Sequence, residues 1–142
     1  MRHAAPFLLA FCVVASAAAQ QHDHAGSPPE KLGTVHFATS CSPEVQPAFD
    51  RAVALLHSFW FSQAREAFTG VLANDSSCAI AYWGIALTHL GNPFTVNRSV
   101  EALGSARAAV EKGLAAGPKT KRERDYLAAA GELFAKFETT DQ

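Results

Sequence analysis

The sequence predicts an all-α protein built from helical hairpins that repeat along the chain. Apolar residues recur every three or four positions in successive segments beyond residue 40, a spacing typical of helices with one buried face. Glycine, proline and clusters of Asn, Asp and Ser separate these segments, and none of them has a convincing strand pattern. One pattern of positions occurs twice, first as Ala64, Phe68, Val71 and Ser76 and then at the same offsets as Ala106, Val110, Gly113 and Pro118. We therefore expect about two and a half copies of a helical hairpin.

The first two helices are predicted to follow each other closely. Ser42, Pro43 and Glu44 form a helix start, with a capping oxygen, a proline where no amide donor is needed and an acid near the positive end of the dipole. A second helix is expected to begin near Ser62, which can cap it, and to end at the polar residues 74–77. The apolar stripe of the first helix is formed by Phe49, Val53, Leu56 and Trp60.

Three more helices are expected in the second half of the chain. The third runs over about residues 78–90 and is stopped by Gly91 and the Asn-Pro pair that follows it. The fourth covers roughly residues 99–116 and ends at a Gly-Pro pair. Thr120 and Glu123 have the spacing of a capping box, which predicts the start of a fifth helix.

The first 19 residues have the features of a cleaved signal peptide. An apolar run over residues 6–15 follows a basic residue, and Ala17, Ala18 and Ala19 supply the small side chains that a signal peptidase needs. The run is shorter than the roughly 20 residues that span a bilayer, so we expect no stable membrane insertion after cleavage. We expect the mature protein to be exported, either to the periplasm or as a secreted protein.

The mature chain is predicted to consist of a leader and one folded domain. Residues 20–40 are rich in His, Gly, Pro and Ser with little periodicity, which predicts a flexible leader that ends in a short extended piece, Val35 to Phe37. The helical domain is expected over residues 41–142. With 49% apolar residues and a net charge of −1, the chain suits one modest globular unit, and it lacks the basic surplus that a nucleic-acid partner requires.

Two cysteines remain after removal of the signal peptide. Cys41 and Cys78 form an even pair in an exported chain, so a disulfide between them is the default expectation. Cys41 precedes one helix and Cys78 opens another. If successive first helices of the hairpins lie side by side, these two leading ends are neighbours. Zinc would need more ligands than this pair supplies.

Three stretches of the chain resemble the tetratricopeptide repeat superfamily and, more closely, exported bacterial repeat proteins of uncharacterised function. These stretches are FATSCSPEVQPAFDRAVALLHSFWFSQAREAF, DSSCAIAYWGIAL and TKRERDYLAAAGELF. The resemblance covers roughly residues 32–137 and implies a tetratricopeptide-like α-solenoid. Members of that family look longer, so the chain is expected to be the N-terminal part of a longer protein. The resemblance implies a fold far better than it implies a function.

Two of the predicted helices have no polar face, which indicates a binding surface. Residues 52–61 and 79–91 contain no charged side chain, and a helix that is apolar all round must be covered on more than one side. Further repeats, a binding partner or the Val35–Phe37 segment folding back could each supply the second cover. Our leading hypothesis is a scaffold that binds a protein or peptide on an open concave surface. This surface would be formed by Phe49, Val53, Leu56, Ile80, Trp83 and Leu87.

The alternative function is metal handling, and we expect no enzymatic activity. Cleavage after residue 19 would place His22 two residues from a free amine, an arrangement that chelates copper or nickel, with His24 close by. No other metal and no cofactor are expected, since the chain has no phosphate-binding Gly-rich loop. His57 and His89 lie in apolar helices without an acid or nucleophile at helical spacing, so we expect them to be core residues.

Overall fold

The computed structural model describes residues 31–92, 94 and 99–136, and in these residues the protein is all-helical, as predicted. No strand occurs in this part of the chain. None of the helices described is long and apolar enough to cross a bilayer. The elements are a short 3-10 helix, Pro43–Val45, followed by α1 (Gln46–His57), α2 (Phe61–Asn74), α3 (Ala79–Thr88), α4 (Val100–Ala115) and α5 (Lys121–Lys136).

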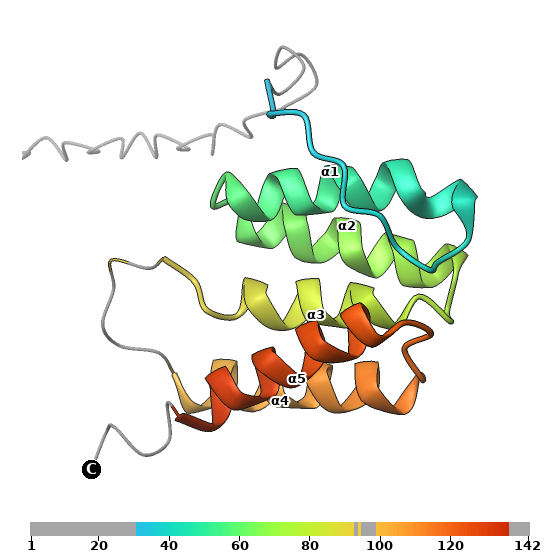
Figure 1. The fold of residues 1–142 in the computed structure, drawn as a ribbon. Helices are drawn as coiled ribbons and strands as arrows, with labels where there is room; N and C mark the ends of the chain where they lie inside the picture. Colours follow the sequence, from blue (N-terminus) through green and yellow to red (C-terminus); the bar gives the residue numbers. More distant parts are fainter. Residues whose placement is uncertain (1–30, 93, 95–98, 137–142) are drawn as a thin grey trace, which may run out of the picture. The chain divides into compact units, whose positions relative to one another are not determined.

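The five α-helices lie side by side and alternate in direction (Figure 1). Helices α1, α3 and α5 run one way, and α2 and α4 run the other way. Each helix contacts the next one in the sequence, and α3 also contacts both α1 and α5. The odd-numbered helices therefore form one layer with α3 at its centre, and α2 and α4 cover the other side of that layer.

The core lies between these two layers and is densest around α3. The Phe68 ring of α2 lies 5.4 Å from the Phe49 ring of α1 and also packs directly over Gly84 of α3. A Cβ atom added at Gly84 would overlap the Phe68 ring, so only glycine allows α2 to approach α3 this closely. Because α3 is covered on several sides, its lack of charged residues has a structural reason. The largest wholly buried side chains are Phe49, Phe68, Phe134, Leu55, Ile80 and Leu127.

The predicted helix boundaries are close to the observed ones. Gly91 and Gly117 follow α3 and α4 with φ angles of +64° and +75°, left-handed conformations that favour glycine. The Glu123 N–H donates to Thr120 Oγ1 at 3.2 Å, as the capping box predicts. The Ser62 cap is wrong, because α2 begins at Phe61 and its cap position is held by Trp60 without a side-chain hydrogen bond.

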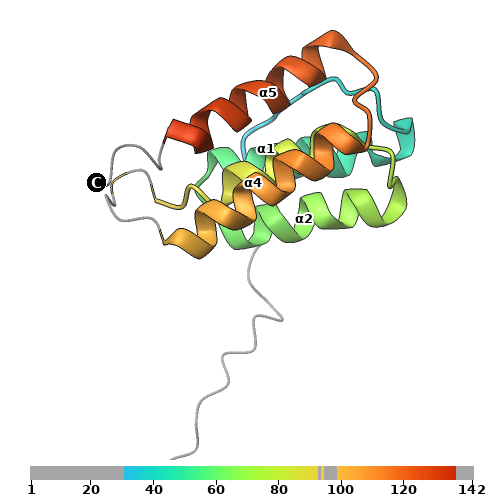
Figure 2. The same ribbon diagram turned by 90° about the horizontal axis from the view of Figure 1, so that it is seen from below.

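The compact unit that contains the helices also contains residues 31–41. Residues 31–41, which we call the strap, have no helical structure and run along the odd-numbered layer between α1 and α5 (Figure 2). Leu32, Val35 and Phe37 are partly buried against the core, so the last part of the expected flexible leader is held in place. The predicted signal peptide and residues 20–30 lie outside the described residues.

Candidate functional site

The candidate site is the surface of α1, α3 and α5 beneath the strap. We call it the covered face and define it by Gln46, Phe49, Asp50, Trp83, Arg122, Glu123 and Tyr126. Helix α1 supplies the first three of these residues, α3 supplies Trp83, and the first turns of α5 supply the rest. All seven side chains contact strap residues 37–40 by ring packing or hydrogen bonds.

Phe37 is the apolar anchor of the strap. Its ring stacks on Trp83 with centroids 5.4 Å apart, and it meets the edge of Tyr126 at 5.3 Å and the tilted ring of Phe49 at 5.6 Å. The guanidinium carbon of Arg122 lies 4.3 Å from the Phe37 centroid, a cation–π distance. Each of the three odd-numbered helices therefore contributes one aromatic ring to the same strap residue.

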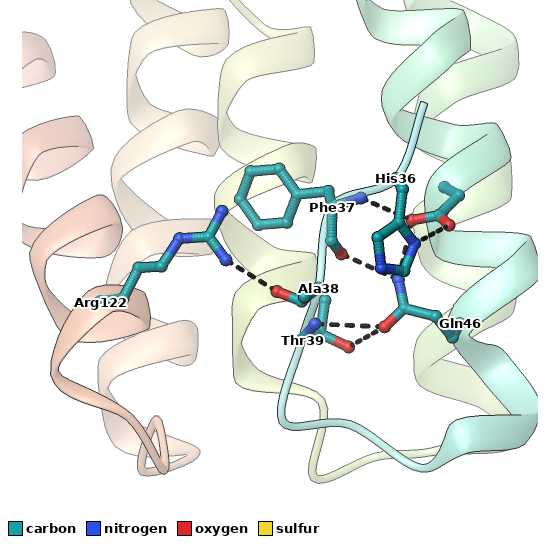
Figure 3. A network of polar contacts seen from close by, with 7 residues as sticks. His36, Phe37, Ala38, Thr39, Gln46 and Arg122 are labelled. Carbon is teal, nitrogen blue, oxygen red and sulfur yellow. Dashed lines mark hydrogen bonds and ion pairs between the residues drawn. The ribbon is translucent and has the colours of Figure 1, made fainter. Parts of the chain in front are cut away.

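The Gln46 side chain binds the backbone of the strap through both ends of its amide (Figure 3). Its Nε2 donates to the Phe37 carbonyl at 2.8 Å, and its Oε1 accepts from the Thr39 N–H at 3.1 Å and from the Thr39 hydroxyl at 2.8 Å. The bonds to the Phe37 carbonyl and to the Thr39 N–H are the pair of backbone hydrogen bonds that a neighbouring β-strand would make with residues 37 and 39. One side chain thus satisfies polar backbone groups that burial would otherwise leave without partners.

Asp50 and Arg122 hold the strap backbone from opposite sides. Asp50 Oδ1 accepts from the Phe37 N–H at 2.9 Å. Arg122 donates to the Ala38 carbonyl at 2.9 Å (Figure 3). Burial raises the pKa of Asp50, but hydrogen bonds from Phe37, His36 and Gln46 outweigh it and leave this pKa below its ordinary value. Asp50 is therefore ionised when it binds the strap at neutral pH.

Glu123 binds the last strap residue before the cysteine. Its carboxylate accepts from the Ser40 N–H at 2.7 Å and from the Ser40 hydroxyl at 2.6 Å, although the residue is only 3% exposed. Burial raises the pKa of Glu123, but hydrogen bonds from Ser40 and Thr120 outweigh it and hold this pKa below its ordinary value. The position in the first turn of α5 also favours a negative charge.

A disulfide fastens the strap to the start of α3. The sulfur atoms of Cys41 and Cys78 lie at bonding distance, with Cα atoms 4.7 Å apart, as the sequence predicts. Beside them, Asp75 accepts from the Ser42 N–H at 2.7 Å and from the backbone and hydroxyl of Ser77. These hydrogen bonds, that of Ser42 above all, lower the pKa of Asp75.

The same three residues form a group of possible metal ligands within the part of the chain that the structure describes. Ligand atoms of Cys41, Asp75 and Cys78 lie within 4.8 Å of one another. In the oxidised protein both sulfur atoms are consumed by the disulfide and cannot act as thiolate ligands. His22 and His24, the predicted copper or nickel ligands, lie outside the described residues.

The six residues expected to form an open concave surface are not open. Phe49, Val53, Leu56, Ile80 and Trp83 are buried and Leu87 is half-buried, so the expected exposure is wrong. The strap covers Phe49 and Trp83. Of the three possible covers, the structure contains the Val35–Phe37 segment folding back.

Leu56 and Leu87 belong to a different place in the fold, at the opposite end of the helices from the disulfide. They line an apolar cavity of 240 Å³ there, together with Phe59 of the α1–α2 connection and Phe61, the first residue of α2. His57 lines the same cavity and is exposed, so its expected core position is wrong. His89 is half-buried, and burial followed by the nearby Arg65 charge lowers its pKa.

Sequence reasoning missed the polar half of the covered face. From the sequence alone, Asp50 is interpreted as a solvated or capping acid. Arg122 and Glu123 are interpreted as part of a solvated first turn of a helix. A weak signal was present, because Gln46 and Asp50 are four residues apart and thus share one face of a predicted helix. Their targets on the strap could not be inferred from that spacing.

The chain was compared with protein-family models, curated proteins and solved structures, and none of them matches it. An amide, two carboxylates and a guanidinium of the covered face are all engaged with the extended backbone of the strap.

Proposed function

We propose that this protein is an exported helical-repeat scaffold that binds an extended peptide segment of a partner protein on its covered face. One observation carries the proposal: this face already holds an extended segment, whose backbone is hydrogen-bonded to side chains of α1 and α5. Contacts to backbone groups tolerate many sequences, so a segment of another protein can make the same contacts. The strap is then an internal occupant of the binding site.

A tetratricopeptide-like repeat is supported by the way that the helices contact one another. Pairs α1–α2 and α3–α4 have the contacts of successive hairpins, and α5 takes the place of the first helix of a third. Phe68 of α2 and Val110 of α4 hold the same position in the repeated pattern, and each lies next to a glycine of the following helix, Gly84 of α3 and Gly131 of α5. In such repeats the layer of first helices forms the binding surface.

Export to the periplasm or out of the cell is supported by the disulfide. Such bonds persist in oxidising compartments and are rare in the reducing cytosol. The predicted signal peptide over residues 1–19 leads to the same compartment. An exported scaffold of this kind would meet segments of other exported proteins.

The test uses the full chain with the substitution Phe37→Ala, which removes the anchor of the strap. A fluorescent peptide of residues 31–40, KLGTVHFATS, is titrated with this variant and with the wild type, and anisotropy is measured. We expect saturable binding to the variant and much weaker binding to the wild type, because the tethered strap competes at a high effective concentration.

The matched control is Phe94→Ala, which removes an aromatic side chain that is 87% exposed and leaves the strap in place. It should bind the peptide as weakly as the wild type. A Phe37→Ala variant that is folded by circular dichroism and does not bind the peptide would contradict the proposed function.

A further inference from the structure

We propose that the covered face selects peptides that carry an aromatic residue and, three positions later, a serine. This inference rests on the proposed function and names the ligand class of the same site. The internal example is the strap sequence from Phe37 to Ser40. In that sequence the two terminal side chains have dedicated partners on the helices, and Ala38 is exposed between them.

The contacts of the strap divide into two kinds. Hydrogen bonds from Gln46, Asp50 and Arg122 to backbone atoms fix an extended conformation without selecting a sequence. The ring contacts of Phe37, the hydroxyl contact of Ser40 and the exposed hydrogen bond between His36 and Asp50 depend on the side chain. The Thr39 hydroxyl adds a contact to Gln46 Oε1, but this acceptor is neutral and only half-buried, and it keeps the Thr39 N–H when the hydroxyl is absent. Selection therefore falls mainly on the first and fourth positions.

The first position requires an aromatic ring. Trp83 stacks on the ring, Tyr126 and Phe49 meet it at an angle, and the Arg122 guanidinium lies over it. An aliphatic side chain would keep part of the buried area but would lose the stacking and the cation–π contact. Arg122 also donates to the carbonyl of the next strap residue, so the cation is fixed in place by the peptide that it recognises.

The fourth position requires a small hydroxyl side chain. Glu123 accepts from both the N–H and the hydroxyl of Ser40, and it is almost completely buried. Alanine at this position would remove one of the two donors to a buried carboxylate. An acidic residue would bring a second negative charge to the same carboxylate, which is unfavourable for both groups. A negative charge at the fourth position should thus be rejected most strongly.

The experiment measures the affinity of the full-length Phe37→Ala chain for five labelled peptides. They are the parent KLGTVHFATS and its variants Phe37→Leu, Phe37→Ala, Ser40→Ala and Ser40→Asp. We expect the last four to bind about tenfold more weakly or worse, because a lost contact of roughly 1.4 kcal/mol corresponds to a factor of ten. Of the two peptides changed at position 40, Ser40→Asp should have the lower affinity.

A change on the helix side separates charge recognition from a general loss of binding. Adding Glu123→Gln to the Phe37→Ala chain removes the negative charge that faces the fourth position. With this double variant the penalty for Ser40→Asp should shrink by about tenfold or more, because the repulsion between two carboxylates is gone. If Phe37→Ala does not fold, Ser40→Ala takes its place as the chain with a weakened strap.

The outcomes are distinguishable. The stated ranking, with a reduced Ser40→Asp penalty in the Glu123→Gln chain, supports the selectivity. Equal binding of all five peptides would overturn the selectivity and leave peptide binding in place. No binding of any peptide by a folded variant would overturn both this inference and the proposed function.

Discussion

The two ends of the helix array are built in opposite ways. One end, which we call the strap end, is where the last strap residue reaches the start of α3. Here a disulfide joins residues 41 and 78, and the carboxylates of Asp75 and Glu123 each accept hydrogen bonds from nearby serines. At the opposite end, the α1–α2 connection leaves large aromatic side chains in solvent. Phe59 is 59% exposed and Trp60 is 41% exposed.

The opposite end also carries backbone strain. Phe59 has a φ of +63°, a left-handed conformation that costs a non-glycine residue about 1–2 kcal/mol. The short connection between α1 and α2 requires this turn, because Trp60 must cap α2 directly after α1 ends. The strap end thus contains a disulfide and hydrogen-bonded carboxylates, whereas residues 58–60 of the α1–α2 connection include neither a cysteine nor an acidic residue.

The largest expected effect comes from removing the disulfide. The double variant Cys41→Ser, Cys78→Ser should lose about 4 kcal/mol of unfolding free energy, since the bond closes a loop with a sequence separation of 37. This loss of unfolding free energy is measured by urea unfolding of both proteins with and without reductant. The wild type should fall to the level of the double variant when reduced, and the double variant should not respond to reductant. An unchanged wild-type midpoint in reductant would contradict the prediction.

Removing the buried carboxylate should have the next largest effect. Glu123→Ala should destabilise the fold by about 2 kcal/mol, because it removes charged hydrogen bonds to the backbone and hydroxyl of Ser40. The matched control is Glu132→Ala on the same helix, where the side chain is exposed and the change should stay within about 0.5 kcal/mol. Equal urea midpoints for the two variants would show that Glu123 does not hold the strap.

Acidification should lower the free energy of unfolding by weakening the contacts at the strap end. We expect this effect to be smaller than that of Glu123→Ala. Asp50, Asp75 and Glu123 have pKa values below their ordinary values in the folded protein, so each stabilises it at neutral pH. That contribution is complete above the ordinary carboxyl pKa, which is 4.5 for Glu123, and is lost as pH falls through the lowered value.

The measurement uses a Trp60→Phe chain, because the sequence has two tryptophans and the remaining one, Trp83, contacts the strap. The unfolding free energy from Trp83 fluorescence should decrease from about pH 4.5 downwards, and less steeply once Glu123→Ala is added. A stability that is flat or rising towards acid would contradict this prediction.

The smallest expected effect is an increase in the free energy of unfolding from a substitution in the α1–α2 connection. Phe59→Asn should stabilise the fold by up to about 1 kcal/mol, because asparagine tolerates the left-handed conformation better than phenylalanine does. Ser58→Asn is the control, since residue 58 has a φ of −91° and no strain to relieve. The gain should be the same with and without reductant. A loss of stability in Phe59→Asn would show that the exposed ring contributes more than the strain costs.

The helices and the disulfide could be predicted from the sequence because their signals are local. Gly91 and Gly117 mark helix ends, and Thr120 and Glu123 mark a helix start. The two cysteines that remain in an exported chain predict a disulfide between them. Each of these signals depends on residues that are close in the chain or on simple counting.

The covered face could be predicted only in part. The aromatic residues Phe49 and Trp83 were identified, and their apolar surroundings indicated correctly that something must cover them. The polar partners were missed, because Ser40 and Glu123 are 83 residues apart and each has an ordinary local explanation. Only the packing of α5 beside α3 brings them together.

The close contact at Gly84 has a consequence for an adjacent face of the same helix. Neighbouring helix positions point about 100° apart, so the rotation of α3 that seats Gly84 against Phe68 also fixes the direction of the Trp83 indole. A side chain at position 84 would turn or lift the helix and so misalign the indole with Phe37. The glycine at position 84 thus sets the orientation of the indole that stacks on Phe37.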